Sequence, residues 1–309
     1  MSVSTLFVLH GLQSTSPSFF LAQITNVRAT TEAQKLVASA AGMPFPQFVA
    51  TPSQKPGLTF DTTQVSTVLA QTGLKGVDLT GGQCFLYFKK ATQLATRVAN
   101  ATTSHMRVLA EQSGLFWDRI SASNRGQASI SCLLKIPYDG TNAPLIPSGS
   151  VALAGTSVAS EQFVCGPVSI NGTSLPAVQS ITIESDIKFI EVSGESDLYD
   201  TFIAVEKVAP TITVRTLNLP ALTTYGINPT ALDGSAGVVA YLKACALDGS
   251  YVANATTSHI KFAALIGDIQ LNEVSAGDNK PAETEIKFTL VGADASTDPL
   301  TITTGSAIT

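Results

Sequence analysis

The eight-residue stretch VANATTSH occurs twice in the chain, at Val98–His105 and at Val252–His259. The starting positions differ by 252 − 98 = 154, which we call the repeat offset and which is about half of the 309-residue chain. Chance repeats of this length are expected only on the order of 10⁻⁵ to 10⁻⁴ times in such a chain, so the octamer indicates internal duplication. A duplicated chain folds as two copies of one module, and the flanking residues test this idea.

The flanking residues follow nearly the same offset. Phe48-Val49-Ala50 stands opposite Phe202-Ile203-Ala204, and Phe88-Lys89-Lys90-Ala91 aligns with Tyr241-Leu242-Lys243-Ala244 after a shift of one residue. The sequence therefore predicts two tandem homologous modules, residues 1–155 and 156–309. Modules of this length are large enough to bury a core of their own.

Charged residues are scarce in this chain. They make up 13% of the residues, the formal net charge is −5, and the mean hydropathy is +0.26. Because so few charges protect the surface against association, we expect other subunits to cover much of it. The net negative charge argues against binding nucleic acid through phosphates, which requires clustered Lys and Arg. No apolar run approaches the roughly 20 residues of a membrane span, so we expect no membrane partner and no export signal.

Alternation of apolar or β-branched residues with polar ones dominates the chain. Such alternation predicts half-buried strands, as at Val178–Glu184, Thr211–Thr216, Glu285–Val291 and Leu300–Thr303. Asn171-Gly172 is typical of a tight hairpin turn. The predicted fold class is mainly β, with two tandem homologous β-sandwich or barrel modules and about one short helix in each.

Two positions in the module are predicted as its helix. Thr31–Ala41 begins with a Thr that can cap a helix, contains good helix formers and is followed by Gly42. Gly234–Leu247, with its counterpart Gly81–Ala95, is the second candidate.

Motifs that carry enzyme chemistry are missing from the sequence. It contains no Gly-rich phosphate loop followed by Lys, no G-x-S-x-G and no H-E-x-x-H. We therefore expect no catalysis, no cofactor and no metal. His105 and His259 are equivalent residues of the octamer. They suit either metal ligands across a subunit boundary or, as we predict, residues that begin the strands Met106–Ala110 and Ile260–Ala264.

The cysteines do not recur between the two copies. A disulfide or zinc framework that belongs to the module would appear in both. We therefore predict buried, reduced, structural cysteines, because cysteine behaves as a small apolar residue. The four are Cys84, Cys132, Cys165 and Cys245.

Acidic residues gather in one segment of the second copy, SDIKFIEVSGESDLYD, residues 185–200. A run of this kind is commonly a solvated face, and the alternative is a long loop that reaches a neighbouring subunit. The aligned segment of the first copy contains basic residues and the apolar kink Met43-Pro-Phe-Pro46. Opposite charges and apolar tips would make such loops complementary. The candidate contact residues are Ser185, Asp186, Lys188, Glu191, Glu195, Asp197, Asp200, Arg28, Glu32 and Lys35.

The segment Val168–Glu184 combines a short strand, an Asn-Gly turn and a longer strand. It resembles the opening hairpin of the tail tube proteins of long-tailed, siphovirus-like bacteriophages, and Glu283–Val291 is similar to a closing strand of that family. Through the duplication, the resemblance extends to the first copy. It implies a virion protein whose modules form rings that stack into a hollow tube for DNA passage. It also implies that the loops at Ser185–Asp200 and Ala29–Pro46 join adjacent rings.

The duplication adds a prediction about symmetry. Six module positions are closed by three chains if each chain supplies two, so we expect a homotrimer with pseudo-sixfold symmetry. The expected partners are further copies of the chain and tail proteins such as the tape measure and the tail terminator. Double-stranded DNA passes through the lumen without specific binding in this interpretation. The resemblance also implies that the protein is made in the host cytoplasm and resides in the virion tail.

Other classes of function stay open at this point. A capsid decoration or fibre protein would share the Thr-rich β composition, and a tail terminator or distal tail ring protein would form rings without polymerising. A secreted adhesin or carbohydrate-binding module would show clustered aromatic residues, which make up only 7% of this chain. An enzyme is disfavoured because the two copies share no acid, base and nucleophile.

Overall fold

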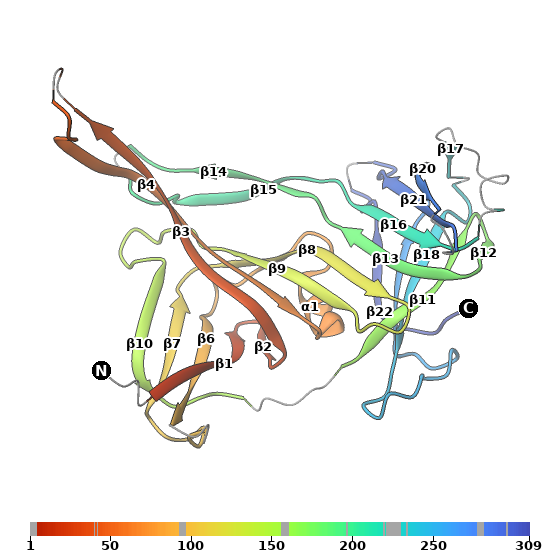
Figure 1. Cartoon of the computed structure of the whole chain (residues 1–309), viewed down its shortest axis with the longest axis horizontal. Coiled ribbons are helices and arrows are strands. Elements are labelled where there is room, and N and C mark those ends of the chain that lie inside the picture. Colours follow the sequence, from red (N-terminus) through yellow and green to blue (C-terminus); the bar gives the residue numbers. More distant parts are fainter. Residues whose placement is uncertain are drawn as a thin grey trace.

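The structure is a computed structural model of the whole chain (Figure 1). It describes residues 5–39, 41, 43–92, 97–155, 161–195, 197–218, 220, 230–232, 234–276, 281–294 and 296–309. The predicted fold class, mainly β, is confirmed. Antiparallel strands form several sheets, and the larger sheets pack face to face around an apolar core.

Two five-stranded sheets lie one in each half of the chain. The first has the order β10-β7-β6-β1-β2, with bounds Leu145–Val151, His105–Ala110, Cys84–Thr92, Thr5–Thr15 and Ser18–Leu21. The second has the order β12-β11-β18-β19-β22, with bounds Thr173–Leu175, Phe163–Ile170, Val238–Ala244, His259–Ala264 and Thr301–Ser306.

A ten-stranded antiparallel sheet, the long sheet, runs through both halves (Figure 1). Its order is β17-β20-β21-β16-β13-β8-β9-β4-β3, and β5 pairs with β8 beside this path. The bounds in that order are Thr230–Ala231, Gly267–Ser275, Glu283–Leu290, Thr211–Thr216, Val178–Glu184, Gly114–Ser123, Ser129–Lys135, Phe48–Thr62 and Ile24–Ala38, with Val77–Asp78 for β5. A separate ribbon pairs β14 (Ile187–Val192) with β15 (Phe202–Val208).

The core lies between the long sheet and the two smaller sheets. In β9, for example, every second residue is buried and the others are half-buried. Alternation of this kind places one face of a sheet on the core and leaves the other face to solvent. A single apolar cluster contains large buried side chains of both halves, among them Phe60, Trp117, Phe262 and Phe288. The two halves therefore share one core.

The strands of the two halves fall at matching positions. His105–Ala110 and His259–Ala264 are related by the repeat offset, since 259 − 105 = 154. The register matches as well, because Ile24 pairs with Thr62 in the first half and Val178 pairs with Thr216 in the second. The segment that corresponds to β3 in the second half forms β13 and β14, which are separated by a short break.

Side-chain contacts correct one part of the sequence alignment. Lys89 Nζ donates to Asn100 Oδ1 over 2.5 Å, and Lys243 Nζ donates to Asn254 Oδ1 over 2.8 Å. Both residues of the pair therefore keep the repeat offset, 243 − 89 = 154. The one-residue shift expected at Phe88–Ala91 is wrong, because the strand ladder, and not residue similarity, decides which positions correspond.

The segments predicted as helices are strands. Thr31–Ala41 lies largely in β3, which pairs with β4. Gly81–Ala95 contains β6 and Gly234–Leu247 contains β18, and both strands are paired on two sides. Helix propensity is a weak preference that long-range pairing overrides. Among the described residues, no helix is long and apolar enough to cross a membrane.

One helix occurs in the described part of the chain, α1 (Val65–Thr72), and the sequence analysis missed it. The carboxylate of Glu161 accepts hydrogen bonds from the N–H groups of Ser66 and Thr67 over 2.8 and 2.9 Å. The indole N–H of Trp117 donates over 2.7 Å to the carbonyl just after the helix. So short a helix is marginal in isolation, and these distant side chains stabilise it.

His105 and His259 begin β7 and β19, as predicted. Both side chains are fully buried. Their Nδ1 atoms accept hydrogen bonds from the N–H groups of Lys90 over 2.9 Å and of Ala244 over 3.0 Å. Each Nε2 lies 2.9 or 3.0 Å from the carbonyl oxygen six residues earlier. Each ring thus bridges two backbone groups, which gives the octamer a structural role in both halves.

The four cysteines are free thiols. Cys84 and Cys132 are buried as predicted, whereas Cys165 and Cys245 are only partly buried, contrary to the prediction. Burial raises the pKa of Cys84 and of Cys165 to about 12. Such thiols stay protonated at neutral pH and react slowly.

Replacing either octamer histidine by alanine is expected to destabilise the chain by a similar amount. The change leaves a buried N–H and a buried carbonyl unpaired, at roughly 1–3 kcal/mol per group. We therefore expect His105→Ala and His259→Ala each to lower the free energy of unfolding by about 2–4 kcal/mol, measured by urea denaturation. The control is Ser258→Ala, whose buried hydroxyl has no hydrogen-bond partner among the described residues. Histidine variants as stable as this control would refute the bridging role.

Candidate assembly interface

The two halves of the chain are joined by antiparallel pairing of β8 with β13 (Figure 1). We call the paired residues, Arg119–Ser123 and Ser180–Glu184, the seam. Ile120 stands opposite Ile183 in the seam, and the two are 1% and 0% exposed. Because β8 belongs to the first half and β13 to the second, the seam makes the long sheet continuous and closes the core beneath it.

Polar contacts hold the other face and the end of the seam. Arg119 Nη2 and Nε donate to Glu184 Oε1 over 2.6 and 3.0 Å. An ion pair this exposed contributes only about 0.2–1 kcal/mol. It nevertheless favours the pairing of a strand that carries Arg with a strand that carries Glu. At the end of the seam, Ser185 Oγ donates to the carbonyl oxygen of Trp117 over 2.6 Å. Ser185, one of the predicted contact residues, is therefore buried next to the seam and closes its end.

The two ends of the long sheet correspond to the two strands of the seam. The first residues of β3 and β13, Ile24 and Val178, are related by the repeat offset, 178 − 24 = 154. β20 carries the same bulge as β8, since the register shifts between Leu271 and Glu273 as it does between Trp117 and Arg119. In addition, β17 covers only the first residues of β20, as β5 covers those of β8. Each end of the sheet thus presents a strand like one that is paired inside the chain.

These ends are exposed at the positions that the seam buries. Val274 corresponds to Ile120, since 274 − 120 = 154, and its side chain is 46% exposed. Ala29 corresponds to Ile183, since 183 − 29 = 154, and it is also exposed. The edge of a strand presents backbone N–H and C=O groups that can pair with another chain. The ends of the long sheet are therefore candidate sites for association.

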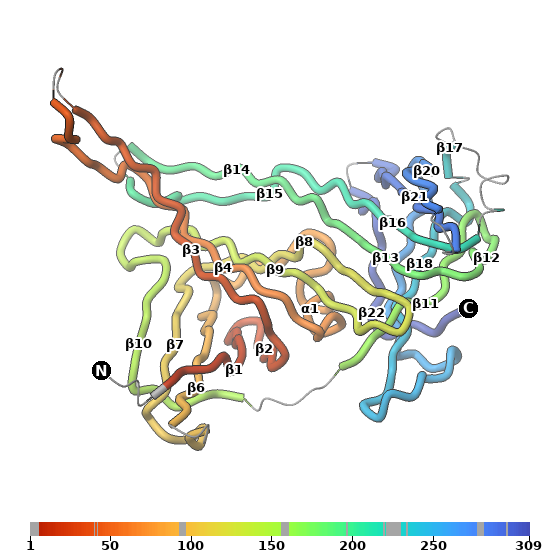
Figure 2. Tube along the Cα trace, in the orientation of Figure 1, coloured from red at the N-terminus to blue at the C-terminus, as the bar shows by residue number. Residues whose placement is uncertain are grey.

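Two hairpins run outward beside each other from the long sheet (Figure 2). We call residues 31–55 of the β3–β4 hairpin the first arm and the β14–β15 ribbon, residues 187–208, the second arm. The first arm projects beyond the body of the molecule (Figure 2). The segments expected as loops, Ser185–Asp200 and Ala29–Pro46, are thus strands in part, since they contain β14 (Ile187–Val192) and the last ten residues of β3. Their polar residues on both faces concealed the alternation that marks a half-buried strand.

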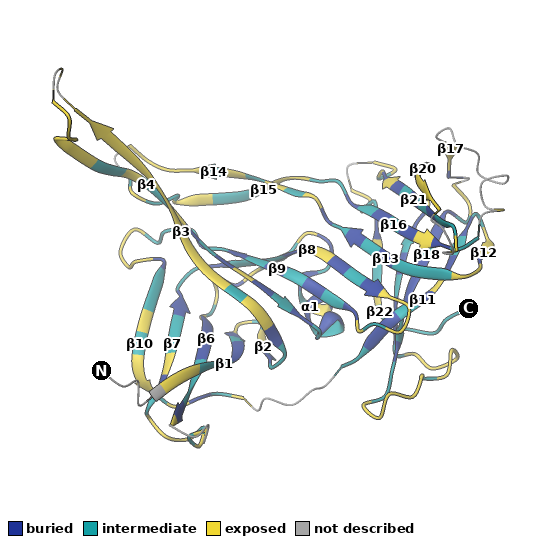
Figure 3. Cartoon of the chain, in the orientation of Figure 1, coloured by how far each residue is buried: buried dark blue, intermediate teal, exposed yellow. Residues whose placement is uncertain are grey.

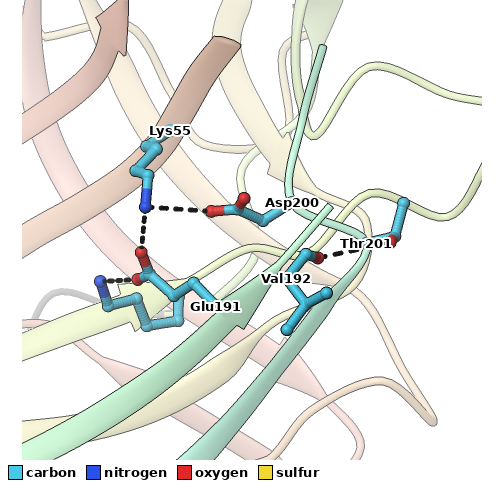
Figure 4. Close-up of polar contacts among 6 residues, drawn as sticks. Lys55, Glu191, Val192, Asp200 and Thr201 are labelled. Carbon is cyan, nitrogen blue, oxygen red and sulfur yellow. Dashed lines mark hydrogen bonds and ion pairs between the residues drawn. The ribbon is translucent and has the colours of Figure 1, made fainter. Parts of the chain in front are cut away.

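The second arm docks on the first half through a charged cluster (Figure 4). Lys55 Nζ lies 2.6 Å from Glu191 and 3.5 Å from Asp200, and Lys135 Nζ lies 2.6 Å from Glu191. Burial raises the pKa of Glu191, but hydrogen bonds and charge from the two lysines outweigh it, so the net pKa is lowered. The hydrogen bond to Glu191 raises the pKa of Lys55. Glu191 is therefore an ionised bridge between two lysines.

Aromatic and backbone contacts reinforce this docking. The Phe189 ring meets the Phe116 ring edge to face, with 4.8 Å between centroids. Near the end of the second arm, the Gln54 N–H donates to the carbonyl oxygen of Leu198 over 2.6 Å. The second arm is consequently attached along its length to β4, β8 and β9.

The other predicted acidic residues serve local structure or face solvent. Asp186 pairs with the neighbouring Lys188 at 2.6 Å. Asp197 accepts the N–H of Gly194 in the turn, and Glu195 is exposed. The acidic run is therefore part docking site and part solvated face.

The three predicted residues of the first copy lie exposed on β3: Arg28, Glu32 and Lys35. Glu32 lines the same hollow of about 640 Å³ as Glu191 and Asp200. The structure thus brings Glu32 near the charged cluster, whereas Arg28 stands at the free end of the long sheet.

Sequence reasoning missed the partners of the second arm. Lys55, Lys135 and Phe116 come from three different strands and stand alone in the sequence. Only the excess of acidic residues in one segment hinted that basic partners lay elsewhere. Finding these partners required the order of the strands in the long sheet.

Both arms are largely exposed (Figure 3), and they carry exposed apolar residues at equivalent positions. Phe48 and Phe202, which the repeat offset relates (202 − 48 = 154), are 56% and 57% exposed. Leu36 and Ile190, at the same offset, are also exposed, and Phe45 at the turn of the first arm is 74% exposed. Exposed apolar side chains that adjoin one another mark surfaces for protein contact.

No protein-family model matches this chain, and no curated protein matches its sequence. Within the described ranges, His, Cys, Asp and Glu side chains form no group of three or more that could hold a metal ion. Four charged residues that line the hollow beside the second arm pair with one another, namely Lys55, Lys135, Glu191 and Asp200. The geometry offers surface for association at the two ends of the long sheet, which pair with no further strand among the described residues, and on the two apolar arms.

Removing the charge of Glu191 is expected to loosen the second arm. Glu191→Gln weakens two charge-assisted hydrogen bonds, which we expect to cost about 1–3 kcal/mol of unfolding free energy. Hydrogen exchange should rise in residues 187–208 and stay unchanged in β18. The control Glu195→Gln removes an exposed charge from the same segment and should change neither quantity. Equal effects of the two substitutions would contradict the bridging role.

Acid should have the same effect as this substitution. Because the folded-state pKa of Glu191 is lowered, its contribution is fully present above the unfolded pKa of about 4.3 and is lost as pH falls through the folded value. The stability difference between wild type and Glu191→Gln should therefore be constant from about pH 7 to 5 and disappear toward pH 3. A difference that persists at pH 3 would show that the carboxylate charge is not its source.

Proposed function

We propose that this protein is a structural virion protein that assembles into rings, which stack into a hollow tail tube for the passage of double-stranded DNA. The seam is the observation that carries this proposal. The seam joins two sheet segments within one chain, and the two ends of the long sheet match the two strands of the seam. Repetition of this strand pairing from chain to chain generates a ring if the rotation closes. The resemblance of Val168–Glu184 and Glu283–Val291 to tail tube proteins supports the same proposal.

The tandem arrangement favours three chains in each ring. If residues 1–155 and 156–309 are copies of one module, each chain supplies two positions and three chains supply six. Strands and registers that recur at the repeat offset support this reading. The scarcity of charge, 13% of residues, fits a protein whose surface is covered by neighbours.

The exposed face of the long sheet suits the wall of a channel. Two of its arginines pair with carboxylates, Arg119 with Glu184 and Arg215 with Glu285, at 2.6 and 2.7 Å. Tight DNA binding requires Lys and Arg that are free to neutralise phosphates. A polar wall with paired charges lets DNA slide past without being held. The smaller sheets, on the other face, then form the outside of the ring.

The arms are the proposed contact between stacked rings. Their exposed apolar positions recur in both arms, so each ring presents six similar hairpins if three chains form it. Other tail proteins, such as the tape measure and the tail terminator, are the expected partners in the lumen and at the end of the tube.

Negative-stain images of the purified protein are expected to show rings or hollow tubes about 100 Å wide, the size of six domains of roughly 30–40 Å around a channel. Sedimentation should give the mass of a trimer or its multiples. A chain that stays monomeric at high concentration would contradict the proposal. Rings that never stack would favour a tail terminator or distal ring protein, and rod-shaped trimers would favour a fibre or decoration protein.

Polar substitutions in the first arm should separate ring formation from stacking. We expect Phe45→Ser with Phe48→Ser to leave single rings and to abolish tubes, because the apolar contact between rings is lost. Leu247→Ser is the matched control, since Leu247 is 65% exposed but lies outside both arms. Electron microscopy measures tube length in each case. Tubes of normal length in the double variant would exclude the first arm as the stacking contact.

A further inference from the structure

We infer that β20 of one copy pairs antiparallel with β3 of the next, with Val274 opposite Ala29, and that Glu273 and Arg28 form an ion pair across this joint. The inference rests on the proposed function, because it names the residues that join the chains of a ring. It also explains how the joint between chains is kept distinct from the seam within a chain.

The register follows from the seam. On its inner side, β3 keeps the register of β13, since Ala29 pairs with Leu58 as Ile183 pairs with Ile212. The bulge that shapes β8 recurs in β20. The residue pairs of the joint between chains therefore follow from the seam pairs, by adding the repeat offset to each β8 residue and subtracting it from each β13 residue. Ile120–Ile183 becomes Val274–Ala29, Ser121–Thr182 becomes Ser275–Arg28, and Arg119–Glu184 becomes Glu273–Thr30.

The joint has a hydroxyl group at the position equivalent to the one that closes the end of the seam. In the seam, Ser185 Oγ donates to the carbonyl oxygen of Trp117. The corresponding residues are Thr31, at 185 − 31 = 154, and Leu271, at 271 − 117 = 154. Thr31 is exposed on β3 and can donate in the same way. The joint therefore offers the hydrophobic pair, the backbone ladder and the closing hydrogen bond of the seam.

The charges of the joint are reversed relative to the seam. The seam has Arg119 on the β8 side and Glu184 on the β13 side. In the joint, Glu273 is on the β20 side and Arg28 is on the β3 side. Arg28 is two residues from Thr30, so it lies diagonally across from Glu273, and diagonal neighbours about 7–8 Å apart are within reach of long side chains.

Glu32 is the other charge near this end of β3. It stands opposite Lys55 in the β3–β4 ladder and lines the hollow that also contains Lys135. Arg28 is the cation of β3 that lies nearest in register to Glu273.

Reversed polarity prevents the wrong strands from pairing. If β8 of one chain paired with β3 of another, Arg119 would meet Arg28. If β13 paired with β20, Glu184 would meet Glu273. Like charges that face each other across two strands disfavour both of these pairings. Head-to-tail pairing of β20 with β3 is the arrangement that joins opposite charges.

Disulfide trapping tests the register. The double variant Ala29→Cys, Val274→Cys should form disulfides between chains under mild oxidation with diamide, and non-reducing gels should show dimers and closed trimers. The control Ala29→Cys, Ser275→Cys is slipped by one residue, which turns the second thiol to the opposite face, and it should cross-link at least tenfold less. Wild type should remain uncrosslinked, because burial raises the pKa of its own cysteines.

Charge exchange tests the ion pair. Arg28→Glu and Glu273→Arg should each weaken ring formation, by roughly fivefold per joint, and the double exchange should restore it. Thermal unfolding of each variant at low concentration verifies that the chain still folds. Sedimentation at several concentrations measures assembly.

The outcomes separate this inference from the proposed function. Rings in the images together with absent or unselective cross-linking would overturn the β20–β3 register and leave the ring proposal intact. A double exchange that fails to restore assembly would overturn the ion pair. A wild-type chain that forms no rings would contradict the proposed function, and this inference would fall with it.

Discussion

The antiparallel ladder between β8 and β13 is the constraint on which the rest of this structure depends. It turns two groups of strands into one sheet, and the shared core forms because that sheet covers both smaller sheets. It also places the second arm over the first half, where Lys55 and Lys135 meet Glu191. Without this ladder, Ile120 and Ile183 would lose the cover that they give each other.

The two arms have the same strand registers but different surroundings. The second arm lies on β4, β8 and β9 of its own chain, whereas the first arm extends away from the body (Figure 2). The second arm lies over the first half of the chain, and no described segment of the chain covers the first arm in the same way. In the proposed assembly, a neighbouring molecule covers the first arm.

The sequence predicted the fold class and many strands, and it missed what depends on long-range pairing. Val178–Glu184 and Thr211–Thr216 were readable because their alternation reflects one buried face. Thr31–Ala41 was not, because an exposed strand of a hairpin has no buried face to reveal its period. Helix α1 was missed because Glu161, far along the chain, stabilises its first turn. The candidate interface was predictable only in part. The acidic segment was visible as a local excess of charge, whereas the seam left no local signal, because its two strands become neighbours only when they pair.

Covalent linkage of the two halves has a consequence for mass action. In a ring of six separate modules, every joint would form between molecules that must first collide. In the proposed ring every second joint is the β8–β13 seam, which forms during folding and at the high effective concentration of a single chain. Ring formation then depends on roughly the third power of protein concentration and not the sixth. A tethered pair of modules can therefore close rings while the protein is still dilute.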